Sequence, residues 1–194
     1  MKTSVVLDTR QPLLARKNAT MFLMHLFGDL HQPLHVAGYR TGGNKLLPLC
    51  WKKAPDSTTH RCDGKLNLHA VWDTNLVHQS RGVALSLDTD KEKATAAKWA
   101  AELYNKKRDA AEVGKDCTEL GSARCIVTWA DESNARVCDS VLRRGEEWVL
   151  SHDLSKKYFE ENAPVIDDLI GKAGIRLAAW LNAIAAATRG KADL

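Results

Sequence analysis

The chain has 194 residues, a 44% hydrophobic and 27% charged composition, and a formal net charge of +4 at pH 7. This is ordinary for a single globular domain, and the charge is too small for a dedicated duplex-DNA binder. No stretch reaches the roughly 20 apolar residues of a membrane span, so we expect no transmembrane segment. The opening residues also lack the apolar core of a secretory signal peptide.

The first predicted element is a helix from about Leu13 to Leu30, which ends before Pro33. Its apolar side chains recur at helical spacing, and we expect four of them to form one stripe: Leu14, Met21, Met24 and Leu26. Gly28 interrupts this helix at a cost of about 1 kcal/mol relative to alanine, which suggests close packing or ligand approach there.

After this helix, Gly42-Gly43-Asn44 marks a tight turn, and the stretch to Gly64 is predicted to be irregular or a short hairpin. A second helix is predicted from about Leu66. The remaining pattern is helical as well. We expect further helices over 91–113, 129–142 and 151–162, with Pro164 starting another that carries an apolar stripe to Ile184. No segment alternates convincingly, so the fold class is predicted to be all-α, with one mostly helical domain over residues 1–194.

Two similar motifs within residues 25–73 contain the candidate metal ligands. The phrase HLFGDLHQPLH contains His25, Asp29 and His35, and the phrase NLHAVWD contains His69 and Asp73. An i, i+4 spacing places two side chains on one face of a helix, one turn apart. Imidazole and carboxylate are ligands that catalytic zinc accepts, so the five residues predict a zinc centre.

His31 and Trp72 lie close to these five residues in the sequence but are not expected to bind the metal ion. His31 follows His25 by six residues and lies on another face, so we expect a structural or ligand-supporting role. Trp72 lies between His69 and Asp73 and is expected to pack in the core, like most of the six tryptophans.

The chain has five cysteines, and two pairs are close in sequence. Cys50 with Cys62 and Cys117 with Cys125 are interpreted as local disulfides of an oxidising compartment, which leaves Cys138 without a partner. Five reduced cysteines in a cytosolic protein are the alternative. Asn18 begins one glycosylation sequon, a weak signal because it falls inside the predicted helix.

These motifs, together with Gly42–Asn44 and the segment WADESNARVC, resemble the zinc-dependent class I nucleases and 3′-nucleotidases. That family includes fungal single-strand-specific nucleases, plant bifunctional nucleases and trypanosomatid surface enzymes, within the superfamily of zinc phospholipase C. The resemblance implies a mostly helical domain that binds up to three zinc ions. It also implies secretion or a cell-surface location.

The resemblance assigns the ligands residue by residue. His35, His69 and Asp73 match the ligands of one zinc, and His25 and Asp29 match two of the four ligands of a second. Asp29 would bridge to the third zinc, so we count it as the catalytic residue of the set. The resemblance also assigns two residues outside the ligand set. Asn75 matches a substrate-binding asparagine, and Cys138 matches a cysteine whose family partner lies further upstream.

Other family ligands precede the region corresponding to His25, and only 24 residues precede it here. We therefore expect an N-terminally truncated family domain, with one zinc held by three ligands, a second held partially, and little or no activity from this chain alone.

The function expected from the resemblance is zinc-dependent hydrolysis of single-stranded DNA or RNA and of 3′-nucleotides, giving 5′-phosphate products or nucleoside plus phosphate. Two alternatives stay open. One is a phospholipase C-like phosphodiesterase, and the other is a non-catalytic remnant that binds metal or nucleotide.

Overall fold

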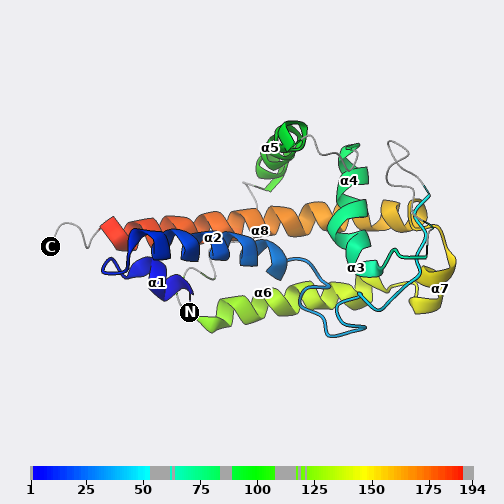
Figure 1. Cartoon of the computed structure of the whole chain (residues 1–194), viewed down its shortest axis with the longest axis horizontal. Helices are drawn as coiled ribbons and strands as arrows, with labels where there is room; N and C mark the ends of the chain where they lie inside the picture. The colour runs from blue at the N-terminus through cyan, green and yellow to red at the C-terminus, as the bar shows by residue number, and fades with distance from the viewer. Residues whose placement is uncertain are drawn as a thin grey trace.

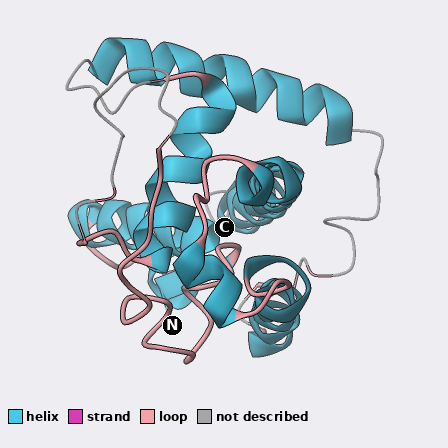
Figure 2. Cartoon of the chain, turned by 90° about the vertical axis from the view of Figure 1, so that its right-hand side faces the viewer, coloured by secondary structure: helices cyan, strands magenta, loops and turns pink. Residues whose placement is uncertain are grey.

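The computed structural model describes residues 2–52, 62, 64–83, 89–107, 117, 119–120 and 122–189. Within these ranges the chain consists of helices joined by loops, and no strand is present (Figure 2). The predicted all-α fold class is confirmed. The nearest approach to a sheet in the described part is one isolated bridge between Cys50 and Asp153.

The longest helix, α8, runs from Lys157 to Arg189 and forms the axis of the molecule (Figure 1). Helix α2 (Leu13–Leu30) lies beside α8 and packs against it. The short helix α1 (Lys2–Leu7), which the sequence pattern did not predict, packs on both. A small apolar cluster holds these three helices together: Val6, Ala19, Leu23 and Ile184.

The segment that carries His69 and Asp73 stands across one end of this pair (Figure 1). It is helical throughout, as α3 (Leu68–Ala70), the π-helical turn η2 (Val71–Asn75) and α4 (Leu76–Arg81). The side chain of Asn67 caps its start by accepting from the backbone N–H of Ala70 at 2.8 Å. Single π-helical turns of this kind are frequent at functional sites.

The remaining helices complete the bundle. They are α5 (Thr89–Lys107), α6 (Ala123–Arg136) with the π-helical turn η3 (Val137–Val141), and α7 (Glu146–Ser151). The predicted helices over 91–113 and 129–142 therefore exist, although residues 108–113 lie outside the described residues and α6 begins six residues earlier than expected.

Pro164 does not start a new helix, contrary to our expectation. α8 begins at Lys157 and continues through Pro164, although proline cannot donate the backbone hydrogen bond of a regular helix. Tyr158 and Ile166, on either side of Pro164, are buried in the same core cluster. Of the apolar stripe predicted on this helix, Ile170 is exposed.

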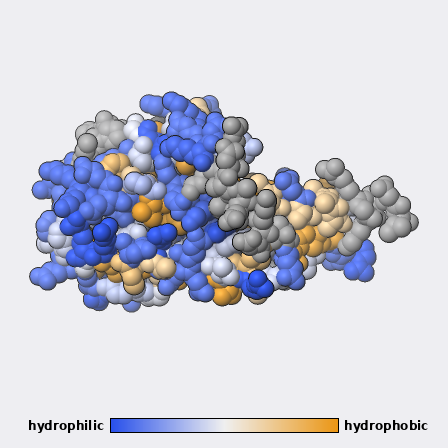
Figure 3. Space-filling model, turned by 180° about the vertical axis from the view of Figure 1, so that it is seen from behind, coloured by the Kyte–Doolittle hydropathy of each residue, from blue (hydrophilic) through white to orange (hydrophobic). Residues whose placement is uncertain are grey.

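The stripe predicted on α2 is on the wrong side of the helix. The side chains that α2 buries are Ala19, Leu23 and Phe27. The four residues of the expected stripe are all exposed: Leu14, Met21, Met24 and Leu26. Leu13 and Phe22 are exposed as well. α2 is apolar around most of its circumference, so periodicity alone could not identify the side that meets α8. At the end of the molecule where α1, α2 and the C-terminal part of α8 lie, apolar residues reach the surface (Figure 3).

Helix α8 is also, within the described part of the chain, the one helix long and apolar enough to cross a membrane by length and composition, over Lys157–Thr188. In the structure it contacts α1, α2, α4 and α5. The expectation of no transmembrane segment stays a prediction.

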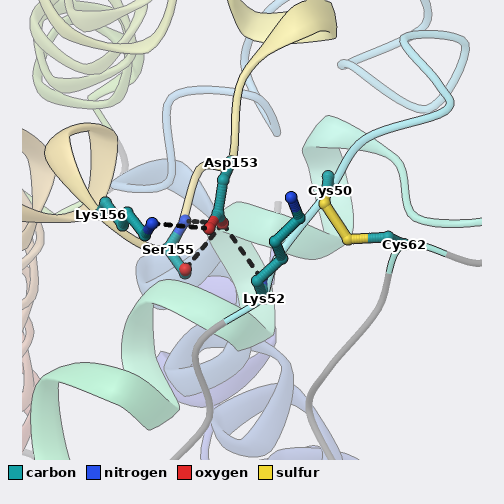
Figure 4. Close-up of a disulfide and its surroundings, with 6 residues drawn as sticks. All are labelled: Cys50, Lys52, Cys62, Asp153, Ser155 and Lys156. Atoms are coloured by element: carbon teal, nitrogen blue, oxygen red, sulfur yellow. Dashed lines mark hydrogen bonds and ion pairs between the residues drawn. A yellow bond between two sulfur atoms is a disulfide. The ribbon is translucent and has the colours of Figure 1, made fainter.

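Both expected disulfides are present, Cys50–Cys62 and Cys117–Cys125, and Cys138 is free and exposed. The first lies beside the bridge to Asp153, where the loop after the Gly42–Asn44 turn meets the segment between α7 and α8 (Figure 4). Asn18 is exposed within α2, so the sequon does lie in a helix.

Candidate metal centre

His35, His69 and Asp73 come together at the junction of the turn after α2 and the segment α3–η2. Nε2 of His35 lies 3.1 Å from one Asp73 oxygen, and Nε2 of His69 lies 3.2 Å from the other. The three side chains can each offer a ligand atom within 4.8 Å of the others. The two imidazole rings stack, with centroids 4.9 Å apart and planes 4° from parallel.

This arrangement fits zinc. Bonds of about 2.0–2.2 Å to nitrogen and oxygen in a tetrahedron place neighbouring ligand atoms about 3.3–3.6 Å apart. Each histidine nitrogen lies near this distance from one oxygen of Asp73, at 3.1 and 3.2 Å, and one ligand atom from each of the three residues lies within 4.8 Å of the others. Three protein ligands with one open position are typical of a catalytic zinc site.

His69 is oriented by the double-glycine turn. Its Nδ1 lies 2.7 Å from the carbonyl oxygen of Gly42, so the ring donates there and leaves Nε2 free toward Asp73. Gly42 has φ +60°, and a Cβ added to it would lie 2.6 Å from the carbonyl oxygen of Leu34. The next residue, Gly43, also has a positive φ, and an added Cβ would lie 3.2 Å from the backbone nitrogen of His69. Only glycine fits this close approach between the two segments.

Gln32 supports the centre, and the sequence did not single it out. Its Nε2 donates to Asp73 at 2.7 Å, and its Oε1 accepts from the backbone N–H of Leu34. One side chain thus fixes both the carboxylate and the turn that carries His35. A signal was available, since Gln32 stands between two histidines in the same short motif.

The second predicted pair is adjacent but arranged differently. Nε2 of His25 lies 3.1 Å from Asp29, and the other Asp29 oxygen lies 3.4 Å from Nδ1 of His35. His35 therefore lies between two carboxylates, with one ring nitrogen toward each. The side chain of His25 is 71% exposed. From this position Asp29 can either offer an oxygen to a cation itself or hold the ring of His35 from behind.

Two hollows flank the three residues. A cavity of about 960 Å³ meets Asp29, His35 and His69, and its apolar walls come from α2, α6 and α8: Leu23, Leu26, Phe27, Leu30, Ile126 and Trp180. A smaller cavity of about 260 Å³ lies on the side of Asp73 and Gln32. Gly28 lines the smaller one, and nothing lies within 4 Å of a Cβ added to it. The expected close packing at Gly28 is therefore wrong, and ligand approach, the other expectation, stays a prediction.

Asn75, the expected substrate contact, is only 2% exposed, and Nδ2 has no hydrogen-bond partner within the described residues. A nucleotide cannot reach it in this structure, and its role stays a prediction. Trp72 packs in the core as expected, where it donates to the hydroxyl of Tyr158 at 2.8 Å. That hydroxyl donates to the carbonyl oxygen of Val141, and burial raises the pKa of Tyr158.

A family model described as S1/P1 Nuclease matches residues 1–186 of the chain. The chain belongs to the S1/P1 nuclease family. Curated relatives include Nuclease S1 of Aspergillus oryzae, 36% identical over 170 residues, which cover 87% of this chain and 54% of that protein. Nuclease P1 of Penicillium citrinum is 32% identical over 86% of this chain and 57% of its own length.

The similarity extends to plants. Endonuclease 4 of Arabidopsis thaliana is 30% identical over 86% of this chain and 50% of its own length. The chain spans about half the length of the curated relatives it matches. Membership of this family confirms the resemblance inferred from the two His/Asp phrases, which lie inside the matched region.

Proposed function

We propose that this chain forms part of a zinc-dependent phosphodiesterase that hydrolyses single-stranded nucleic acid and 3′-nucleotides. The observation that carries the proposal is the convergence of His35, His69 and Asp73 from two separate segments, with one ligand atom from each within 4.8 Å of the others. The names of the relatives, nucleases and endonucleases, support this substrate class.

His35, His69 and Asp73 would hold the ion, with Gln32 and the carbonyl oxygen of Gly42 fixing two of them. A zinc ion in such a site lowers the pKa of bound water toward about 7 and polarises phosphoryl oxygens. We assign His25 and Asp29 to a second, partial ligand set. His25 is exposed and Asp29 partly exposed, and both lie beside the first set, which supports this assignment.

The larger cavity supports a single-stranded substrate. Its apolar walls lie directly beside His35 and His69, so an unstacked base could bind there while its phosphate faces the metal ligands. A base paired inside a duplex must first leave the helical stack, which costs a few kcal/mol. The two disulfides support action in an oxidising compartment, which for this family we take to be the secretory pathway.

Zinc content and strand cleavage test the proposal together. After dialysis against zinc buffer, the wild-type chain should retain one tightly bound zinc, and Asp73→Asn should lose it. With zinc, wild-type protein should cleave a single-stranded DNA oligonucleotide slowly and leave 5′-phosphate ends. Turnover is expected to be slow because the described residues supply one complete three-ligand set, whereas the second set, His25 and Asp29, is partial.

The Asp73→Asn protein, purified in the same way, controls for contaminating nuclease. Asp139→Asn, at an exposed position on η3, controls for the loss of a carboxylate elsewhere. A folded wild-type protein that retains no zinc, or cleavage that Asp73→Asn leaves unchanged, would contradict the proposal. Cleavage of phosphatidylcholine without cleavage of DNA would redirect it to a lipid phosphodiesterase.

A further inference from the structure

A polar network joins the turn after α2 to α6 and α8, and two of its members, His31 and Arg176, are buried. It begins at His31, which is 3% exposed and lies in the turn between Asp29 and His35. Nδ1 of His31 lies 2.7 Å from the carbonyl oxygen of Phe27. The backbone N–H of His31 bonds to Gly28 instead, so the side chain satisfies one of the last carbonyls of α2.

Arg176 of α8 continues the network. Its Nη1 donates to Nε2 of His31 at 2.9 Å, and its Nη2 donates to Glu132 of α6 at 2.5 Å. Its guanidinium lies over the ring of Trp129, 5.1 Å from the centroid. Because arginine can only donate, the His31 nitrogen facing it must accept, and the ring is neutral with its proton on Nδ1.

The network is also charge-balanced. Lys172, one turn before Arg176 on α8, binds Glu132 and pairs with Asp168 at 3.0 Å. Two cations therefore face two carboxylates, and α2, α6 and α8 meet in one hydrogen-bonded cluster. The bond between His31 and Arg176 matters most for geometry, because both residues are buried and removing either side chain leaves a buried polar atom of the other without this partner.

The turn that His31 anchors is the one that presents the metal-binding side chains. Asp29 precedes His31 by two residues, Gln32 follows it directly, and His35 comes one turn later. The backbone N–H of Gln32 bonds to Asp29, and that of His35 bonds to Gln32. A movement of His31 would therefore carry this whole turn with it, and the ligand separations would change.

We propose that His31 and Arg176 are positioning residues that set the metal affinity of the centre, by fixing the turn from Asp29 to His35 against α6 and α8. The inference rests on the proposed zinc-dependent function. Neither side chain belongs to the set of His35, His69 and Asp73, and both act through the turn that carries Asp29 and His35. Ligand atoms in a zinc site must be placed within a few tenths of an ångström, so a loosened turn weakens binding while the fold persists.

The test compares Arg176→Met and His31→Leu with a control of the same chemistry. Arg81→Met is the control, because Arg81 also lies over a tryptophan, 4.3 Å from the centroid of Trp99, and pairs with Asp167 of α8 at 2.7 Å. Arg81 lies outside the network of His31 and Arg176, and its ion pairs are with Glu102 and Asp167. His31→Gln is the conservative variant, since its amide can both donate and accept.

Zinc dissociation constants, from competition with a chromogenic chelator, should rise about tenfold for Arg176→Met and His31→Leu, as is usual when support of a metal ligand is lost. Arg81→Met should stay within about twofold of wild type although its thermal midpoint falls comparably. His31→Gln should recover most of the affinity. Equal zinc affinity in all four variants would overturn the proposal.

A metal-free measurement separates this proposal from the proposed function. The imidazole NMR resonances of His35 and His69, which depend on the stacking of the two rings, should shift in metal-free Arg176→Met and His31→Leu and remain in place in Arg81→Met. If the wild type bound no zinc, the proposed function would fail, and these resonances would still decide the positioning role. Unshifted resonances in a folded Arg176→Met or His31→Leu protein would overturn it.

Discussion

His69 donates its Nδ1 proton to the carbonyl oxygen of Gly42, 27 residues earlier in the chain, at 2.7 Å. This contact joins the double-glycine turn to the helix that carries Asp73, and it leaves Nε2 of His69 facing the carboxylate. The tautomer and the ring plane of one expected zinc ligand are thus set by a backbone atom. Turn geometry therefore has direct consequences for metal binding.

Gly42→Ala should impair both folding and metal binding. The new Cβ would lie 2.6 Å from the carbonyl oxygen of Leu34, and the backbone would keep a positive φ that alanine disfavours by about 1–2 kcal/mol. We expect a loss of about 2 kcal/mol or more in the free energy of unfolding, since the clash adds to this strain, and zinc affinity at least tenfold weaker. Chemical denaturation and zinc titration measure the two effects.

Gly38→Ala is the matched control for this change. Nothing lies within 4 Å of a Cβ added at Gly38, so the variant should keep its zinc affinity. If Gly42→Ala bound zinc as tightly as Gly38→Ala, the contact between Gly42 and His69 would not control ligand orientation.

Gln32→Leu should weaken zinc binding with a small effect on stability. The substitution removes the 2.7 Å donation to Asp73, which holds the carboxylate in place, and loss of such a partner costs about 10- to 100-fold in metal affinity. Gln79→Leu removes an amide that donates to the backbone of Ser155, outside the centre. Zinc titration of both proteins gives the comparison, and equal affinities would show that Gln32 plays no supporting role.

Asp153→Asn should reduce stability at neutral pH and lose its effect in acid. Burial opposes ionisation of Asp153, but donation from the hydroxyl of Ser155 and from the backbone N–H of Lys52 outweighs it and lowers the pKa (Figure 4). A lowered pKa contributes stability above the ordinary value of 3.8, and this is lost as pH falls through the folded-state pKa.

Denaturation curves of wild type and Asp153→Asn between pH 7 and pH 2 test this. The difference in free energy of unfolding should be constant down to about pH 4 and then shrink. Asp90→Asn, at a fully exposed position on α5, should show no comparable difference. A gap that widened in acid would contradict the assigned sign.

Leu23→Ala and Met24→Ala, neighbours on α2, should differ sharply. Leu23 is buried against α1 and α8, so its truncation should cost about 2–5 kcal/mol in the free energy of unfolding. Met24 is exposed, so its truncation should change stability by less than about 0.5 kcal/mol. Urea denaturation of the two variants decides which face of α2 is buried, and similar losses would place a packing partner on the Met24 side.

The local parts of the metal centre could be predicted from the sequence. His25 with Asp29 and His69 with Asp73 are four residues apart, and helical geometry alone brings each pair within 3.1–3.2 Å. The bounds of α2 also followed from local signals, because Pro33 prevents the helix from continuing.

The tertiary structure decided the rest. The buried side of α2 depends on where α1 and α8 pack, and a helix apolar on most sides does not determine its own orientation. His35 lies between Asp29 and Asp73, and Gln32 bonds to Asp73, because two segments about 40 residues apart meet. Spacing along the chain fixes relations within one or two helical turns, whereas contacts between distant segments depend on the packing of the whole bundle. The sequence by itself therefore determined which side chains could bind a metal ion, and tertiary packing decided which three of them converge.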